Sequence, residues 1–459
     1  MKNIKYILIC IVTLSLTSCH LYKKYELPVD NSYVNTYAES LKEAENDSTS
    51  LPFLSWEEVF TDTVLQRYIR IALERNKDLD NAVKNIDIAR AQLKGAKLSY
   101  YPSVALNPNG GASKYGSGSM DKWTYTVPLS ISWEADIFAK LLNKKRGAEV
   151  YVEQMEDYYQ AVRSQIVCSV ASCYYNLMFL HQQLGLAQRT SEIWKDQVET
   201  MRLMKLAGRV TEAAVVQSDA NYWNVMSTIP DIKNSIHSLE NTMSLLLHSY
   251  PNQWSVSEKM DFTLPVSIAQ GVPISYLAAR PDIRAAERSL ASAYYTTTGA
   301  RAAFYPGLTI SINGGFTDLL GSVIYNPGKF FLQLAGSLAA PIFSRGVNIA
   351  NLEVAKANQE KAMNDFETII LSASSDVSTA LITYKYNDEK EGYILKQIDD
   401  LEKSVEYTEE LMQFDKSTTY LEMLTARSSL LSAQISSLTA WHNKVSALIS
   451  LYQAVGGGR

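Results

Sequence analysis

The chain has 459 residues, a length that exceeds a usual single hydrophobic core and predicts two domains or an extended repeat architecture. Hydrophobic residues make up 46% and charged residues 20% of the chain, a composition that is typical of a folded protein and excludes a disordered one. The net charge is -5 at pH 7 and there is no basic run, so we expect no binding to nucleic acid.

Residues 1–18 have the pattern of a lipoprotein signal peptide. Lys2 and Lys5 give a positive start, a short apolar core follows, and the segment leads into Leu-Thr-Ser-Cys at 16–19. Small residues before a cysteine resemble the bacterial lipobox, in which the cysteine becomes the acylated N-terminus. The pattern therefore predicts lipidation at Cys19. The alternative is an ordinary signal peptide followed by an incidental cysteine.

Residues 19–55 are predicted to be an extended tether between the lipid anchor and the folded body. From Val29 to Ser50 the composition turns to Asn, Ser, Asp, Glu and Thr, with few large apolar side chains. Such a segment cannot bury enough apolar surface to form a core of its own. We expect no chemistry from it.

Two stretches of the body match each other at one constant offset. Aligning Asp78 with Asp282 requires no gap from Arg75 to Gly111 and indicates an internal duplication. The first repeat then covers 56–265 and the second covers 266–459. The matched residues are Gly95 with Gly299, Ala96 with Ala300, Tyr101-Pro102 with Tyr305-Pro306, and Asn109-Gly110-Gly111 with Asn313-Gly314-Gly315.

In each repeat a helix is expected before the Tyr-Pro pair and a β-hairpin after it. Proline ends the helix because it lacks an N–H group and disfavours helical geometry in the residue before it. After Pro306, the apolar residues Leu308 and Ile310 alternate with polar ones, as in a strand with one apolar face. The hairpins are expected over about 103–137 and about 307–342, which gives four strands per chain.

A pair of very long helices is expected after each hairpin. From Ala139 to Lys205 the chain contains no proline, and apolar residues recur at steps of three and four. A turn near Gly208 sends the chain back, so the first helix pair covers about 139–248. The second pair covers about 346–455.

The half-apolar strands could belong to a soluble sandwich or to a membrane barrel. Trp123 and Trp133 are about ten residues apart, which at ~3.3 Å per residue and a tilt of ~45° spans roughly 24 Å, close to the apolar band of a membrane barrel. Four strands cannot stand alone in lipid, because both sheet edges would leave backbone groups unpaired. Such a barrel must close between chains: two chains would fill its lumen with side chains, whereas three would leave an open passage.

The chain resembles the TolC-like outer membrane factors of tripartite efflux systems, in the OprM/NodT-type outer membrane efflux lipoprotein branch. The likeness extends over nearly the whole mature chain, and its most specific motifs are RPDIRAAE at 280–287 and LYQAVGGG at 451–458. The other matching residues are Leu16–Cys19, Trp56 and Phe60, Ala72-Leu73, Asn76, Asp78-Leu79, Trp133-Glu134, Asp136–Phe138, Ile229-Pro230 and Pro341–Phe343.

The resemblance implies an α+β membrane protein with an internal structural repeat. It implies a homotrimer whose twelve-stranded outer-membrane β-barrel, with four strands from each chain, continues into a long periplasmic α-helical barrel. The protein would be a passive, gated exit duct for small molecules such as drugs and toxic compounds, delivered by an RND-type inner-membrane pump through a periplasmic adaptor protein. It would lie in the outer membrane, anchored in lipid through Cys19, without a cofactor or a catalytic residue.

The resemblance also places a periplasmic gate and the contacts with the adaptor at the two helix turns. Family members carry acidic residues after the second turn; here Glu422 takes one acidic position, while Thr425 stands where a second acid often lies. In a trimer, a ring of three carboxylates could bind cations and set the aperture. The alternative for Glu422 is a solvated carboxylate on a helix surface. The other gate candidates are Asp219 and Asp415, and the expected adaptor-contact residues are Gly208, Arg209, Val210, Lys416, Ser417 and Thr418.

Three other functions explain the sequence less well than an efflux duct or equally share its architecture. An enzyme is disfavoured, because the histidines form no HExxH pair and no GxSxG motif is present. A pore-less coiled-coil structural lipoprotein would explain the helices but not the amphipathic strands. An outer-membrane channel for type I protein secretion or for metal-ion export would share the architecture, although the methionines are scattered and give no metal signal.

Overall fold

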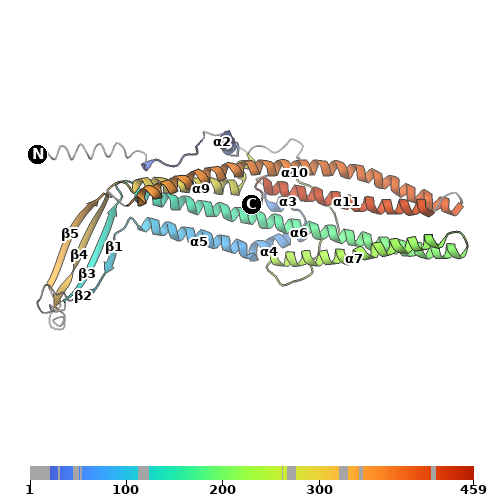
Figure 1. Ribbon diagram of the computed structural model, residues 1–459, viewed down its shortest axis with the longest axis horizontal. Helices are drawn as coiled ribbons and strands as arrows, with labels where there is room; N and C mark the ends of the chain where they lie inside the picture. Colours follow the sequence, from blue (N-terminus) through green and yellow to red (C-terminus); the bar gives the residue numbers. More distant parts are fainter. Residues whose placement is uncertain are drawn as a thin grey trace. The chain divides into compact units, whose positions relative to one another are not determined.

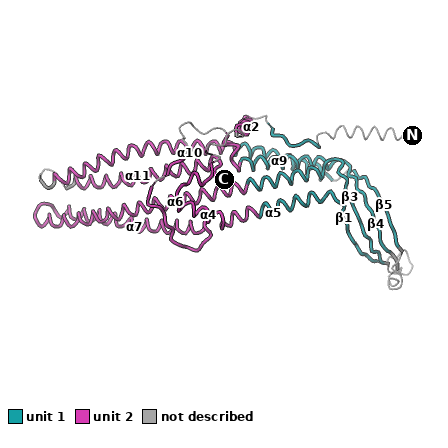
Figure 2. The backbone as a smooth tube through the Cα atoms, turned by 180° about the vertical axis from the view of Figure 1, so that it is seen from behind, with its two compact units in different colours: residues 1–30, 84–157, 283–369 teal, residues 31–83, 158–282, 370–459 magenta. Residues whose placement is uncertain are grey.

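The computed structural model of the chain describes residues 21–28, 32–44, 51, 54–111, 124–260, 262–265, 275–319, 329–340, 345–414 and 420–458. The predictions on Cys19, Asp415 and residues 416–418 lie outside these ranges. The chain divides into two compact units, and each unit combines segments from both halves of the sequence (Figure 2). The first unit comprises residues 1–30, 84–157 and 283–369, and the second comprises 31–83, 158–282 and 370–459.

An antiparallel β-sheet dominates one part of the first unit (Figure 1). Its strands follow the order β1-β3-β4-β5, and β2 lies beside β3 in line with β1. The first predicted strand, which Pro108 and several glycines were expected to interrupt, consists of two short strands on either side of Pro108, because proline cannot donate to a strand ladder. The strands are β1 (Ser103–Leu106), β2 (Asn109–Gly111), β3 (Thr124–Ala135), β4 (Gly307–Leu319) and β5 (Lys329–Ala339).

The centre of the sheet depends on a glycine opposite a proline. Gly315 of β4 pairs with Pro128 of β3, and a Cβ atom at position 315 would lie 2.2 Å from the carbonyl oxygen of Val127 and 2.9 Å from the Cα atom of Pro128. No side chain can occupy that space. Glycine at this position therefore allows β3 and β4 to approach closely where the proline interrupts the ladder.

Long helices make up most of the chain, and they occur in two series of similar lengths (Figure 1). The 22-residue helix α5 has its counterpart in α9, also of 22 residues. The 67 residues of α6 compare with 68 in α10, and α7 and α11 have 35 residues each. Their bounds are α5 (Lys77–Leu98), α6 (Lys140–Leu206), α7 (Glu212–Leu246), α9 (Pro281–Ala302), α10 (Val347–Phe414) and α11 (Tyr420–Ala454).

The second unit also contains short helices, of which the first two are capped by side chains. They are α3 (Trp56–Val59), α4 (Thr63–Arg75) and α8 (Tyr276–Ala279). Ser55 and Glu58 form a reciprocal capping box at the start of α3. Asp62 caps α4 by accepting the N–H groups of Val64 and Leu65 at 2.8 and 3.2 Å, and its other carboxylate oxygen accepts the hydroxyl of Tyr174 at 2.8 Å.

Aromatic side chains form the core of the second unit. Phe60 stacks on Phe262 with ring centroids 5.7 Å apart and meets the edge of the fully buried Tyr452 at 5.6 Å. Tyr175 lies 5.0 Å from Phe262 and continues the cluster toward Trp441. Aromatic pairs of this kind add about 0.5–1.5 kcal/mol each to the energy of burying their area. They join segments that are far apart in the sequence.

The segment predicted as an extended tether differs from that expectation. Residues Ser32–Ala44 form helix α2, which packs on α8 within the second unit. Val34 and Tyr37 have no exposed surface. The large apolar residues of this segment are few, but their spacing of three places them on one helix face. The overall composition of the segment does not reveal that face.

Residues 21–28 of the same segment are bound to the first unit. Asn143 donates to the carbonyl of Leu21 at 2.9 Å, and Arg146 donates to the carbonyl of Tyr22 at 3.0 Å. The hydroxyl of Tyr22 in turn donates to the carbonyl of Ile137 at 2.6 Å. The chain just after position 19 is therefore fixed beside the junction of β3 and α6.

Candidate functional site

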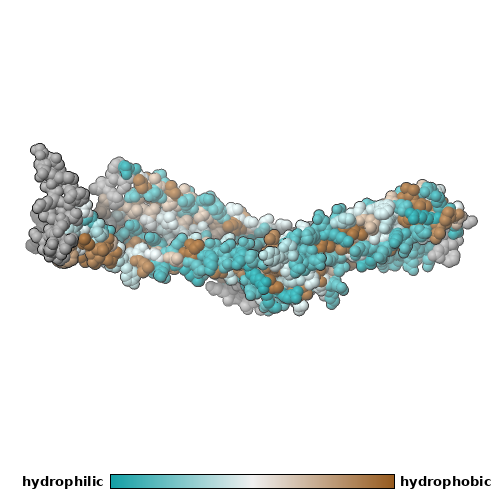
Figure 3. All heavy atoms as spheres, turned by 90° about the horizontal axis from the view of Figure 1, so that it is seen from below, coloured by the Kyte–Doolittle hydropathy of each residue, from teal (hydrophilic) through white to brown (hydrophobic). Residues whose placement is uncertain are grey.

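The sheet presents one continuous apolar face to the outside. The register places Val104, Ile131, Ile312 and Leu334 in one row across the four paired strands. On β5, the exposed fractions are 65% for Phe330 and 72% for Leu334. Figure 3 shows apolar side chains gathered over the strands. The other exposed members of this face are Leu106, Leu129, Trp133, Phe316, Leu332 and Leu338.

The opposite face of the sheet is polar. Ser132 pairs with Ser311 and Glu134 pairs with Thr309 across β3 and β4, and Gln333 faces Asn313 across β4 and β5. Successive residues of a strand point to opposite faces, so this set lies on the side away from the apolar rows. A sheet with large apolar side chains exposed on one face and polar ones on the other is suited to separate lipid from water.

Both outer edges of the sheet lack a partner strand in the described part of the chain. The strand path begins at β1 and ends at β5. Each of these strands therefore has one edge whose backbone N–H and C=O groups are offered outward, which is an edge at which another chain can add a strand.

The turn between α6 and α7 contains the first set of predicted tip residues, Gly208, Arg209 and Val210. Gly208 has φ of 70°, and the N–H groups of Gly208 and Arg209 donate to the carbonyls of Lys205 and Met204, both at 2.9 Å. This left-handed glycine ends α6 as in other helix C-caps. Leu206, just before the turn, is 84% exposed.

Ion pairs join α6 to α7 behind this turn. Lys205 pairs with Glu212, and Arg202 pairs with Asp219 at 3.4 Å. The carboxylate of Asp219, a predicted gate residue, is therefore paired with an arginine of the neighbouring helix α6. Arg202 was not predicted as its partner, because the pair joins two different helices and depends on how they lie against each other.

Glu422, the other described gate candidate, lies exposed in the first turn of α11. Behind it, Arg427 of α11 pairs with Glu409 of α10. Farther along the same two helices Lys444 contacts Asp388 and Glu391. The α10–α11 pair is thus joined by ion pairs as the α6–α7 pair is, and Glu422 and Asp219 lie on different helix pairs.

The two most specific sequence motifs meet in the second unit. A Cβ atom on Gly456, whose φ is 86°, would lie 2.9 Å from the backbone of Ala279 and Arg280. Arg280, whose side chain is 10% exposed, contacts Asp282 at 2.7 Å and Asp376 at 3.3 Å. Burial lowers the pKa of this guanidinium, but the two carboxylates outweigh that effect and the net pKa is raised.

The glycines near the end of the chain are also held in place by hydrogen bonds. The hydroxyl of Ser164 donates to the carbonyl of Gly457, Arg163 donates to the carbonyl of Gly458 at 3.0 Å, and the N–H of Gly458 donates to the hydroxyl of Tyr452 at 2.8 Å. No role was predicted from the sequence for the LYQAVGGG motif at 451–458. In the structure, its glycines fix the end of α11 against α6 and α8.

None of the described helices combines the length and the apolar composition that crossing a membrane requires. Within the described ranges, no three His, Cys, Asp or Glu side chains are placed to hold a metal ion.

Comparisons with known proteins agree with this architecture. The family model "Outer membrane efflux protein" matches residues 68–247 and 272–457. The chain is 28% identical over 458 residues to the cation efflux system protein CusC of Escherichia coli O6:H1, covering 97% of each chain. It is 25% identical to the solvent efflux pump outer membrane protein SrpC of Pseudomonas putida, over 90% of this chain and 88% of the relative.

The likeness extends to three dimensions. A crystal structure of CusC superposes with a TM-score of 0.83 at 24% identity and covers 95% of this chain and 98% of that one. At this identity the match shows the fold, which is that of the TolC-like channels with a helical barrel and a β-domain.

Proposed function

Because the family model matches most of its length, the chain belongs to the outer membrane efflux protein family, and we propose that it is the outer-membrane channel of a tripartite efflux system. Proteins of this family are efflux channels and the chain is not an enzyme. In the proposed role it is a passive, gated exit duct for small molecules, and the pump supplies the energy of transport.

The amphipathic sheet is the observation that carries this proposal. Large apolar side chains of β1, β3, β4 and β5 are exposed in matched rows. A water-soluble sheet would bury such a face at about 25 cal/mol per Å². The exposure of these apolar side chains is explained if lipid covers the apolar face of the sheet and water contacts its polar face.

The outer edges of β1 and β5 support a homotrimer. If β5 of one chain paired with β1 and β2 of the next, no backbone group of the sheet would remain unpaired in lipid. Counting β1 and β2 as one interrupted strand, three chains would close a twelve-stranded barrel with an open passage. The helices would continue it as a periplasmic helical barrel.

The matched helix lengths support an internal duplication. The bounds of α5 and α9 coincide when Asp78 is aligned with Asp282, and the two later helix pairs agree within one residue in length. The proposed repeats, 56–265 and 266–459, each supply a short helix, a strand pair and a long helix pair. The two compact units cut across these repeats, because long helices of both repeats belong to each unit.

The cargo proposed is a small toxic compound, and a metal ion is the second candidate. SrpC, a relative, is named for solvent efflux; CusC, another relative, is named for cation efflux. The likeness to CusC is the observation that favours metal-ion export. Because a passive duct selects little by itself, the pump and the adaptor would decide between the two.

The remaining parts of the proposal concern contacts with other components. Acylation at Cys19 would anchor the chain in the outer membrane, and the hydrogen bonds at 21–22 would hold the anchor beside the end of β3. The turn at 208–210 and residues 416–418 would contact the periplasmic adaptor, which leads to an RND-type pump. Glu422, Asp219 and Asp415 would line the periplasmic aperture.

Three measurements test the proposed function. Purified protein should run as a heat-modifiable trimer and conduct ions in planar bilayers. A deletion strain should become more sensitive either to solvents and drugs or to metal cations, and that difference identifies the cargo. A stable monomer in detergent that is released from membranes after delipidation would instead indicate the pore-less structural lipoprotein.

A further inference from the structure

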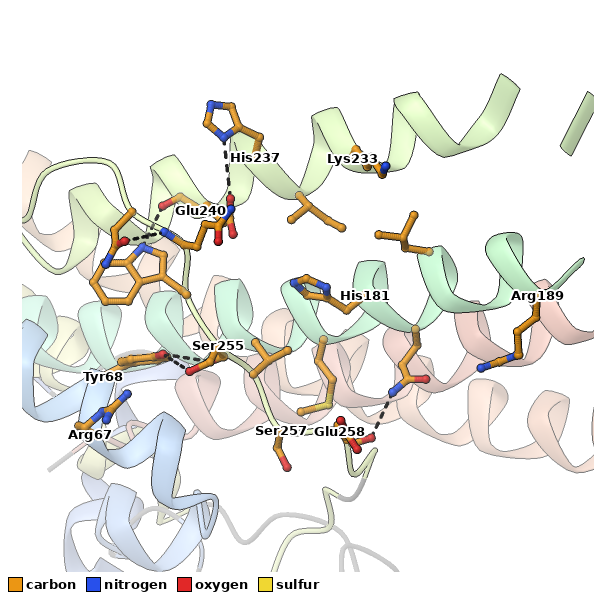
Figure 4. Close-up of a pocket in the computed structure, with 18 residues that line it drawn as sticks. Arg67, Tyr68, His181, Arg189, Lys233, His237, Glu240, Ser255, Ser257 and Glu258 are labelled. Atoms are coloured by element: carbon orange, nitrogen blue, oxygen red, sulfur yellow. Dashed lines mark hydrogen bonds and ion pairs between the residues drawn. The ribbon is translucent and has the colours of Figure 1, made fainter. Parts of the chain in front are cut away.

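A cavity of about 1190 Å³ lies within the second unit, between α4, α6, α7 and residues 252–258 (Figure 4). Binding sites for small ligands usually measure about 300–1,000 Å³, so this cavity has room for one. Nothing in the proposed duct function makes use of it.

One wall of the cavity has no regular secondary structure but is tied to the helices. Trp254 Nε1 donates to Ser244 Oγ at 2.9 Å and to the carbonyl of Glu240 at 3.2 Å. The hydroxyl of Tyr68 donates to the carbonyl of Ser255 at 2.9 Å. These bonds attach the start of the wall to α4 and α7.

The far end of the wall is attached to α6. Gln182 Nε2 donates to the carbonyl of Glu258 at 3.1 Å, and the N–H of Ser257 donates to the hydroxyl of Tyr174 at 2.9 Å. A wall that is held by three helices needs little ordering when a ligand enters, which favours binding.

Three cations line the cavity without carboxylate partners. Arg67, Arg189 and Lys233 belong to its lining, and across the described residues none of them takes part in an ion pair of the kind that joins the helix tips. Figure 4 shows Arg67 on α4 toward one end, and Arg189 and Lys233 toward the other, on α6 and α7, with His181 between. The separation favours an elongated ligand.

Two carboxylates also face the cavity. Glu240 has a side chain that is 11% exposed and lies 3.8 Å from Nδ1 of His237, while Glu258 belongs to the wall. Three guanidinium or ammonium groups thus oppose two carboxylates, of which one is already beside an imidazole. The lining therefore carries a net positive charge in a chain whose net charge is -5, and a positive lining attracts anions.

We propose that the cavity binds a small elongated polyanion, a ligand with phosphate or carboxylate groups at both ends. Arg67 contacts one end, and Arg189 and Lys233 contact the other through charge-assisted hydrogen bonds. The aromatic pair of Tyr68 and Trp254, with ring centroids 5.4 Å apart, supports the wall beside the Arg67 end.

Isothermal titration of the full protein in detergent tests this inference, with inorganic tripolyphosphate and citrate as separate probes. Saturable binding at one site per chain is expected for at least one probe, and the preferred probe identifies a phosphate or a carboxylate ligand. Arg67→Gln and Lys233→Gln should each weaken binding at least tenfold, a loss of about 1.4 kcal/mol or more. Both side chains are exposed, so the substitutions should leave folding intact.

The matched control is Lys396→Gln, which removes the same charge from an exposed position on α10 that does not line the cavity. It should leave the affinity unchanged. The inference is overturned if neither probe saturates, or if Lys396→Gln weakens binding as much as the cavity substitutions do.

Discussion

Asn76 and Arg280 each donate a hydrogen bond to the last carbonyl of a long helix. Asn76 Nδ2 reaches the carbonyl of Leu246 at the end of α7 at 3.0 Å, and Arg280 Nη1 reaches that of Ala454 at the end of α11 at 3.0 Å. The two positions coincide in the alignment that joins Asp78 to Asp282. The final carbonyls of a helix have no partner within the helix. Different side chains at equivalent positions thus provide a hydrogen-bond donor to the last carbonyl of α7 and to that of α11.

Asn76→Ala should destabilise the protein by about 1–3 kcal/mol. Asn76 also caps α5, because its Oδ1 accepts the N–H groups of Asp78 and Leu79 at 2.8 and 3.4 Å. The substitution removes both the cap and the partner of the Leu246 carbonyl. Chemical denaturation followed by circular dichroism measures the change. Asn81→Ala, at an exposed position of α5, is the control, and an equal effect of both substitutions would contradict the capping role.

Gly456→Ala should lower stability by about 1–3 kcal/mol, because alanine is strained at φ of 86° and its Cβ atom would contact the backbone of Ala279 and Arg280. Gly392→Ala is the matched control. Gly392 lies inside α10 with no atom near the added Cβ, so this change should stabilise the helix by about 0.5–1 kcal/mol. Thermal unfolding of the two variants should therefore shift in opposite directions, and parallel shifts would argue against tight packing at the terminal glycines.

Leu334→Lys should prevent stable insertion of the sheet into the membrane. Leu334 lies on the exposed apolar face, and a lysine near the middle of a lipid-facing strand costs about 2–4 kcal/mol. Gln333→Lys places the same charge on the polar face of the same strand and should be tolerated. The amount of heat-modifiable protein in urea-washed outer membranes distinguishes the two. If both variants insert equally well, lipid does not cover the apolar face.

The sequence was sufficient to predict the elements whose signal is periodic. The alternation of Leu308 and Ile310 with polar residues gave β4, and the proline-free run after Ala139 gave α6, because strands and helices repeat their apolar residues at different spacings. Helix α2 was not predicted, because its few apolar residues are diluted in a polar composition, and their burial depends on the packing of α2 on α8. The interruption between β1 and β2 could be predicted from Pro108, because proline cannot donate to a strand ladder.

The contacts of the candidate site were less predictable than its elements. Gly208 could be placed at a turn because glycine favours the left-handed conformation. The pairing of Asp219 with Arg202 depends on how two helices lie against each other, and the charged lining around Lys233 combines three helices with a loop. Such long-range arrangements are determined by packing rather than by spacing along the chain.

The two buried thiols should resist alkylation in the folded protein. Burial raises the pKa of Cys168 from 9.0 to about 12 and that of Cys173 to about 11. Because the folded pKa exceeds the unfolded one, the protonated thiols contribute stability that is present below the unfolded pKa and is lost as the pH rises above it. Iodoacetamide at pH 9 should modify neither residue until denaturant is added, as read by peptide mass spectrometry. Modification of the native protein would show that the helices open at this point.

Glu422→Ala should raise the single-channel conductance in planar bilayers or weaken the block by divalent cations. Glu422 is exposed in the first turn of α11, and in a trimer three such carboxylates would attract cations and repel one another at the aperture. Glu360→Ala, a loss of an exposed carboxylate far from the turn on α10, is the control. Low-salt recordings are the sensitive condition, because a Debye length of about 30 Å at 0.01 M leaves the ring unscreened. Identical traces for wild type and Glu422→Ala at low salt would show that Glu422 is only a solvated surface carboxylate.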